Sequence, residues 1–121
     1  MTRLAFKYDA DASVRRTAVR GAKSDETRLA FKDDVKALVR EAAVRGAKSD
    51  ATRLAFMDDD DAYVREGAVS GVRSITILQL ALEREKVQGL RRIIQRRIKT
   101  VERNQAAARL LQKRKRDGVL T

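Results

Sequence analysis

The first 74 residues repeat one pattern of apolar and polar positions three times. The copies cover residues 2–26, 27–51 and 52–74, with a period of 25 residues, and are called units one, two and three. Units one and two are identical at 18 of 25 aligned positions, and units two and three at 15 of 23. Such self-similarity is typical of helical-repeat proteins, in which each unit packs on its neighbours.

Each unit predicts two short helices. The first is TRLAF, which follows Ser24-Asp25 in unit two and Ser49-Asp50 in unit three, so either residue of each pair can be the N-cap. The second helix spans VKALVREAAVR after an acidic turn, with Asp34 as its expected cap. A glycine follows this helix in every unit, and its tolerance of positive φ suits a helix C-terminus: Gly21, Gly46 and Gly71.

Helical spacing predicts the core. One face of the second helix of unit two is apolar, through Val39, Ala43, Val44 and Ala47. The alanines at positions 18, 43 and 68 allow neighbouring helices to approach closely. We expect larger side chains of the TRLAF segments to fill the space opposite them: Leu4, Phe6, Leu29, Phe31, Leu54 and Phe56.

The pattern continues in weaker form after residue 74. Leu80-Ala81-Leu82 takes the place of Leu-Ala-Phe, and Leu90-Arg91 that of Val64-Arg65, which indicates a degenerate capping unit. From Gly89 to Gly118 the chain has neither Pro nor internal Gly, which predicts one long helix. The expected parts are three repeats in residues 1–74, a capping unit in 75–95, and a basic C-terminal helix and tail in 96–121.

The TRLAF segment, the acidic turn and the following Val-Arg and Ala-Val pairs resemble the leucine-rich repeat variant and the wider HEAT-like helical repeats. The resemblance covers residues 2–74 and extends towards residue 95. It implies an all-α fold, a short right-handed α-solenoid of about three to four two-helix repeats, and binding of proteins or nucleic acids. The chain lacks the proline often found in the acidic turn, and it lacks the cysteine cluster with which some variant-repeat proteins hold an iron–sulfur centre. The resemblance therefore implies no cofactor.

Charged residues also recur in phase. An aspartate can cap its own helix, and an arginine can bridge to the acidic turn of an adjacent unit. HEAT-like repeats use such an Asp–Arg ladder to hold their stacking register, so the resemblance favours this structural role over the alternative, in which the arginines face a ligand. The candidate ladder comprises Asp9, Asp34, Asp59, Arg15, Arg40 and Arg65.

A second group of cations recurs at the same period. Stacked helices would arrange these residues in columns that track a phosphate backbone or an acidic partner. The alternative is a solvated face balanced by acids such as Asp58 to Asp61, and the small net charge of this region favours that alternative. The columns are Arg3/Arg28/Arg53, Arg20/Arg45 and Lys23/Lys48/Arg73.

Charge divides the chain into two parts. Its 28 Lys and Arg exceed its 17 Asp and Glu by 11. Residues 1–74 hold 15 basic and 13 acidic residues, whereas residues 75–121 hold 13 basic and 4 acidic residues. The excess positive charge therefore lies in the C-terminal part.

Composition excludes several kinds of site. Without Cys or His the chain has no disulfide, no thiolate or imidazole chemistry and none of the usual zinc sites. It has no Gly-rich phosphate loop, and Asp58 to Asp61 lack the ligand spacing of a calcium loop. We therefore expect no enzyme activity, metal or cofactor. No run is apolar enough to span a bilayer and no apolar leader is present, so we expect a soluble intracellular protein.

The long C-terminal helix combines an apolar stripe with a cationic face. The stripe contains Leu90, Ile94, Ile98 or Val101, Ala108 and Leu111. Helical spacing places Arg92, Arg96, Lys99 and Arg103 together on a separate face. The full candidate set for binding nucleic acid is Arg91, Arg92, Arg96, Arg97, Lys99, Arg103, Arg109, Lys113, Arg114, Lys115 and Arg116.

Three partners suit such a helix: a nucleic acid, a protein or second copy that packs on the stripe, and an anionic membrane. The stripe lacks Trp and Phe, which makes the membrane the weakest of the three, and a solvated helix without a ligand is the remaining alternative. No aromatic residue is interleaved with the cations, so contact with phosphates is expected rather than base stacking. The sequence predicts a non-enzymatic scaffold or adaptor that binds RNA or DNA within a multi-subunit assembly. The alternatives are an acidic protein as partner, or a protein–protein module that docks or dimerises through the stripe.

Overall fold

The computed structural model describes residues 3–118, which form seven α-helices, one 3-10 helix (η1) and no strand. The expected all-α fold is confirmed. Short and longer elements alternate until a long final helix begins: η1 (Arg3–Phe6), α1 (Ala12–Arg20), α2 (Asp25–Leu29), α3 (Ala37–Arg45), α4 (Asp50–Leu54), α5 (Ala62–Ser70), α6 (Ile75–Arg84) and α7 (Gln88–Arg116).

Serine caps the short helices. The hydroxyl of Ser24 accepts the Thr27 N–H at 3.3 Å, and that of Ser49 accepts the Thr52 N–H at 3.2 Å. Ser74 caps α6 in the same way. The neighbouring aspartates Asp25 and Asp50 are thereby free for contacts outside their own turns.

The cap of the second helix differs from the expectation. Asp11 and Asp61 are the N-caps of α1 and α5, two residues beyond the expected position, and α3 begins after Lys36 without a side-chain cap. The prediction that Asp34 is the N-cap is therefore wrong. Its carboxylate accepts the Lys36 N–H at 2.9 Å and holds the turn that leads into the helix.

The recurring glycines have a different role from the predicted one. Gly21, Gly46 and Gly71 occupy C-cap positions with φ of −85°, −85° and −100°, so no left-handed conformation requires a glycine there. A Cβ on Gly46 would lie 2.8 Å from Nε of Arg28, and one on Gly71 would lie 2.5 Å from Nε of Arg53. At Gly46 and Gly71, glycine makes room for a buried arginine.

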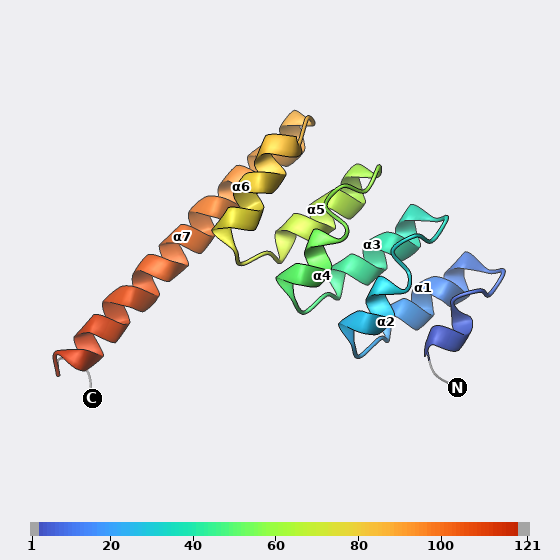
Figure 1. Cartoon of the computed structure of the whole chain (residues 1–121), viewed down its shortest axis with the longest axis horizontal. Helices are drawn as coiled ribbons and strands as arrows, with labels where there is room; N and C mark the ends of the chain where they lie inside the picture. The colour runs from blue at the N-terminus through green and yellow to red at the C-terminus, as the bar shows by residue number, and fades with distance from the viewer. Residues whose placement is uncertain (1–2, 119–121) are drawn as a thin grey trace.

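Small residues bring successive helices together. Helix α3 contacts α1 on one side and α5 on the other, and α7 contacts α5 and α6 (Figure 1). Ala18, Ala43 and Ala68 are buried, as are Phe31 and Phe56. Leu4 and Leu54, by contrast, are 42% and 40% exposed, so the expectation that these leucines belong to the core is wrong. In a one-turn helix, Leu and Phe two residues apart point to different sides.

Helix α7 has a packed half and a free half. Leu90, Ile94 and Val101 are buried, but every residue from 102 to 116 is exposed. The helix runs unbroken through residue 95, where the sequence suggested a boundary between two parts. We call residues 3–101 the stack and residues 102–116 the projecting segment, which extends away from the other helices in Figure 1.

Candidate functional site

Arginines of the longer helices each join two units. The Nε atoms of Arg15, Arg40 and Arg65 lie 2.8 Å from carboxylate oxygens of Asp34, Asp59 and Glu85 in the next unit. Nη1 of the same arginines donates to a backbone carbonyl of its own unit, at 2.6 to 2.8 Å. Nη2 of each arginine donates to the second oxygen of the same carboxylate. All three guanidinium nitrogens are thus used inside the stack, and we call this set of contacts the ladder.

Electrostatics favours the charged form of both ladder partners. Burial raises the pKa of Asp34, but the hydrogen bonds from Arg15 and from the Lys36 N–H outweigh it, so the pKa lies below its ordinary value. Burial raises the pKa of Glu85 too, but its hydrogen bonds, chiefly the one from Arg65, outweigh it, so this pKa also lies below its ordinary value. The hydrogen bond to Asp59 raises the pKa of Arg40. These arginines serve packing and are not available to a ligand.

A second set of contacts between units was not expected from sequence. The Asp25 carboxylate accepts the backbone N–H groups of Lys48 and Ser49 at 2.9 Å, together with a bond from Arg28. Asp50 binds the N–H groups of residues 73 and 74 in the same manner. Burial raises the pKa of Asp25, but these hydrogen bonds lower it far below its ordinary value. The signal was present in the recurring Ser-Asp pair, in which serine alone suffices as the cap.

The predicted basic columns are only partly on the surface. Arg28 and Arg53 are 6% and 8% exposed, and each donates to a buried carbonyl at 2.6 Å, so that column is not a cationic surface. The side chain of Arg3 lies outside the described part of the chain. The remaining column residues are exposed: Arg20, Lys23, Arg45, Lys48 and Arg73. Among them, Arg45 pairs with Glu41 at 2.9 Å and Lys48 donates to the Lys23 carbonyl at 3.0 Å.

Two of the eleven candidate cations of α7 belong to the stack. Arg91 donates to the carbonyl of Glu85, six residues earlier, which is the spacing that Arg15, Arg40 and Arg65 use in the ladder. Arg97 donates to the Val72 carbonyl at 3.0 Å. In earlier units, Arg28 and Arg53 donate the matching hydrogen bond. The residue in register with them after unit three is Leu78, which has no side-chain donor, and Arg97 supplies the bond instead. Arg91 and Arg97 are therefore structural.

The other nine candidate cations of α7 are exposed. At about 100° per residue, Arg92, Arg96, Lys99 and Arg103 fall within about 60° of one another, on the side opposite the buried Leu90, Ile94 and Val101. They extend over about 16 Å along the helix axis at about 1.5 Å per residue. The only acidic residue of α7 is Glu102. We call these four residues the cationic face; the other exposed candidates are Arg109, Lys113, Arg114, Lys115 and Arg116.

Charge is also segregated across the stack. Helices α1, α3, α5 and α7 run in the same direction, so the acidic turns before them lie along one edge (Figure 1). The opposite edge carries the C-terminal ends of these helices and the exposed cations Arg20, Lys23 and Lys48. The projecting segment leaves the stack on this basic side (Figure 1).

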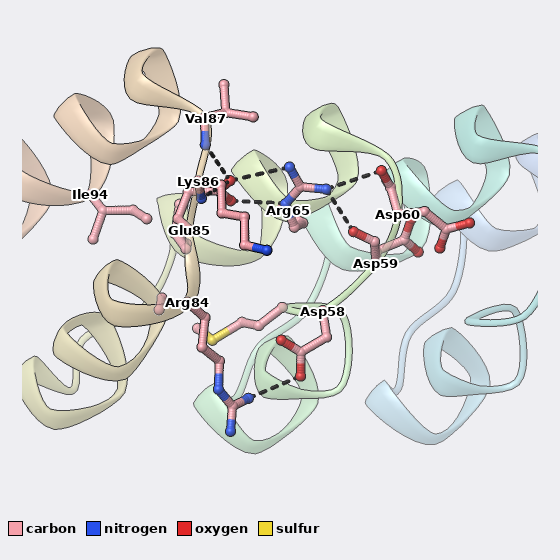
Figure 2. Close-up of a pocket in the computed structure, with 12 residues that line it drawn as sticks. Asp58, Asp59, Asp60, Arg65, Arg84, Glu85, Lys86, Val87 and Ile94 are labelled. Atoms are coloured by element: carbon pink, nitrogen blue, oxygen red, sulfur yellow. Dashed lines mark hydrogen bonds and ion pairs between the residues drawn. The ribbon is translucent and has the colours of Figure 1, made fainter.

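A pocket of about 320 Å³ lies between the acidic turn of unit three and the turn between α6 and α7. Figure 2 shows that its charged groups face one another: Arg65 binds Glu85, and Arg84 binds Asp58 at 2.9 Å. The Glu85 carboxylate also accepts the Val87 N–H. This pocket is therefore part of the ladder, and the charges of Arg65, Glu85, Arg84 and Asp58 are already paired.

Comparison with family models, with curated proteins and with solved structures yields no match to this chain. Within the described residues, no group of three or more acidic side chains is arranged to hold a metal ion. None of the described helices is long and apolar enough to cross a membrane. The cationic face of α7 is thus the strongest candidate for a functional surface.

Proposed function

We propose that this chain is a non-enzymatic scaffold, a short α-solenoid of the HEAT-like kind, that binds the phosphates of RNA or DNA through α7. The observation that carries the proposal is the cationic face, which points away from the stack while the opposite side of the helix is buried. Such a protein is suited to act as one component of a larger assembly.

The shape and chemistry of the face favour a linear polyanion. Its cations are spaced by about 4.5 to 6 Å of helix rise, and the nucleic-acid backbone presents a continuous row of negative charge. Three of the four residues are arginines, whose planar guanidinium binds phosphate oxygens in pairs. Helix α7 has no aromatic residue, so binding through phosphates requires no particular base.

The stack supports this role by holding the helix. Ile94 and Val101 are 1% and 5% exposed, so the cationic face is fixed relative to the stack rather than carried on a free peptide. A preorganised surface loses less conformational entropy on binding. The repeated ladder from Arg15 to Glu85 supports the view that the stack is a small solenoid closed by α6 and α7.

The apolar stripe of α7 gives less support to the alternative function, a protein–protein module that docks or dimerises through this stripe. Leu90, Ile94 and Val101 are buried within the chain itself and are not available to a partner. The apolar residues that stay exposed lie in the projecting segment, with Leu110 and Leu111 at 51% and 48%. A docking groove for the whole stripe is therefore not part of the proposal.

Salt dependence tests the proposal. Fluorescence anisotropy with labelled duplex RNA, duplex DNA and single strands would give Kd over a salt series. Four phosphate contacts predict a log–log slope of about −3.6 for duplex DNA, which is roughly a hundredfold loss of affinity between about 50 and 200 mM salt. The probe that binds most tightly, whether duplex RNA, duplex DNA or a single strand, identifies the source of the phosphates. Binding that does not change with salt would contradict the proposal.

A matched pair of variants tests the location. In the first, Arg92→Gln, Arg96→Gln, Lys99→Gln and Arg103→Gln remove the cationic face. In the second, Arg20→Gln, Lys23→Gln, Lys48→Gln and Arg73→Gln remove the same charge from the basic edge. We expect a large loss of affinity and a shallower salt slope only in the first variant. Equal losses in both would show a response to net charge alone, and tighter binding to polyglutamate than to nucleic acid would identify an acidic protein as the partner.

A further inference from the structure

The N-terminal end of the stack repeats a surface that is covered elsewhere in the molecule. In units two and three, Phe31 and Phe56 are 1% exposed and Val39 and Val64 are 0% exposed, because the preceding unit packs on them. The equivalent residues of unit one, Phe6 and Val14, are partly exposed. They line a groove of about 310 Å³ together with Ser13, Thr17 and Ala18.

The same end holds a carboxylate without its arginine. Asp34 and Asp59 each bind an arginine of the preceding unit at 2.8 Å. Asp9 occupies the equivalent position in unit one and accepts the Asp11 N–H at 2.9 Å. Among the side chains that the structure describes, no arginine forms an ion pair with Asp9. By the register of units two and three, Asp9 belongs to the same face as the apolar groove. A face with these two features matches a helix that carries small residues and one arginine.

The covering helices of the stack share one pattern. An arginine is followed by a small apolar residue at the third and fourth positions and, just after the glycine that ends the helix, by another apolar residue at the seventh, as in Arg40, Ala43, Val44 and Ala47. The pattern recurs from Arg15 and from Arg65. The same spacing also occurs in the projecting segment, where all four residues are exposed and fall within about 100° of one another around the helix. They are Arg103, Ala106, Ala107 and Leu110.

The sizes of the residues also match. A Cβ on Gly67 of α5 would lie 2.9 Å from Cγ1 of Val44, so a glycine faces a valine where α3 covers α5. In register, Thr17 takes the place of Gly67 at the open end, and Ala107 takes the place of Val44. The larger residue on the groove is thus matched by a smaller residue on the segment.

We propose that the projecting segment of one molecule docks on the N-terminal face of a second molecule. In this arrangement Arg103 binds Asp9, Ala107 packs against Thr17, and Leu110 covers the groove beside Val14. The contact joins two different surfaces, so it generates a chain or a ring rather than a closed two-fold dimer. Arg103 belongs both to the cationic face and to the docked segment, whereas Arg92, Arg96 and Lys99 lie outside that segment. Association of protein that carries no nucleic acid therefore tests the docking separately from the proposed function.

The test is sedimentation of nucleic-acid-free protein over a range of concentrations at moderate salt. We expect the mean mass of the wild-type protein to rise with concentration. Asp9→Arg and Arg103→Asp, each introduced alone, should weaken association by about tenfold to a hundredfold, since each places like charges opposite one another in a bidentate site. The matched control is Lys115→Asp, which changes the charge equally on another side of the helix and should associate like the wild type.

Mixing separates a docking defect from a folding defect. In a mixture of the Asp9→Arg and Arg103→Asp variants, every contact can again pair opposite charges, one as in the wild type and one with the charges exchanged. The mixture should therefore associate like the wild type, in alternating order, although each variant alone associates weakly. Combining both substitutions in one chain should restore association. The proposal is overturned if the wild-type protein stays monomeric at the highest concentration, or if Arg103→Asp associates as well as the wild type.

Discussion

The stack and the projecting segment are both rich in arginine, yet they use it in opposite ways. In the stack the side chains of Arg15, Arg40 and Arg65 are 9%, 15% and 18% exposed, and each faces a carboxylate. In the projecting segment the Arg116 side chain is 74% exposed, and Glu102 is the only acidic residue. Arginine becomes part of a core where carboxylates recur in phase with it, and stays exposed to solvent where they do not.

The comparison predicts that removing a ladder arginine has the largest effect. Arg40→Ala removes the arginine that binds the Asp59 carboxylate and the Asp34 carbonyl, and breaking such a buried ion pair costs about 3–5 kcal/mol. Because small domains are stable by only about 5–15 kcal/mol, we expect the isolated chain to be largely or wholly destabilised. Urea unfolding followed by circular dichroism measures this effect.

The control for this prediction is Arg20→Ala, which removes an exposed arginine of the neighbouring helix and should change stability by no more than about 0.5 kcal/mol. If Arg40→Ala unfolded with the same midpoint as the wild type, the distinction between packing arginines and surface arginines would not hold.

The second prediction concerns acid. The pKa of Asp25 is lowered in the folded protein, so its contribution is fully present above the ordinary pKa of a carboxyl group and is lost as the pH falls through the folded value. Asp25→Asn should cost about 1.5–3 kcal/mol at neutral pH, since hydrogen bonds to a charged group are lost. The difference from the wild type should shrink below pH of about 4.

Thermal unfolding of both proteins between neutral pH and strong acid would show this convergence. Asp33→Asn provides the comparison, because its side chain is 88% exposed and should leave the acid profile unchanged. A constant gap between Asp25→Asn and the wild type at every pH would exclude the carboxylate as the acid-sensitive group.

The third prediction uses the glycines. Gly71→Ala should destabilise the protein by about 1–2 kcal/mol, because the new Cβ meets an Arg53 guanidinium that is held by Asp50 and by the Ala47 carbonyl. Gly89→Ala meets nothing within 4 Å and lies in the first turn of α7, so it should stabilise the helix by about 0.5–1 kcal/mol. Equal effects of the two substitutions in chemical denaturation would argue against close packing at Gly71.

The smallest effect is expected from deleting the projecting segment. A chain that ends after Glu102 should unfold within about 0.5 kcal/mol of the full chain, because residues 102–116 are exposed. A chain that ends after residue 93 loses the buried Ile94 and Val101 and should be strongly destabilised. Calorimetry of the two truncated chains locates the point at which α7 ceases to support the stack, and a large loss in the first chain would show that the segment packs on it.

The spacing of apolar and charged residues in the sequence predicted much of the fold but only part of the candidate site. The period of 25 residues placed Val39, Ala43, Val44 and Ala47 on a buried face, and all four are buried. The same reasoning placed Leu4 and Leu54 in the core, where they are not, because a single helical turn has no long face to define. Glu85 escaped notice as a ladder residue, although counting six residues back from Arg91 leads to it.

Local sequence determined that the chain is helical, where most helices begin and end, and that its positive charge is concentrated near the C-terminus, because caps, periodicity and charge act over a few neighbouring residues. Tertiary structure alone decided which cations stay in water. Arg91 and Arg92 are neighbours of the same type, yet one binds carbonyl groups of the α6 end and the other is exposed. That difference depends on which side of α7 packs on α5 and α6, and this packing involves residues far apart in the chain.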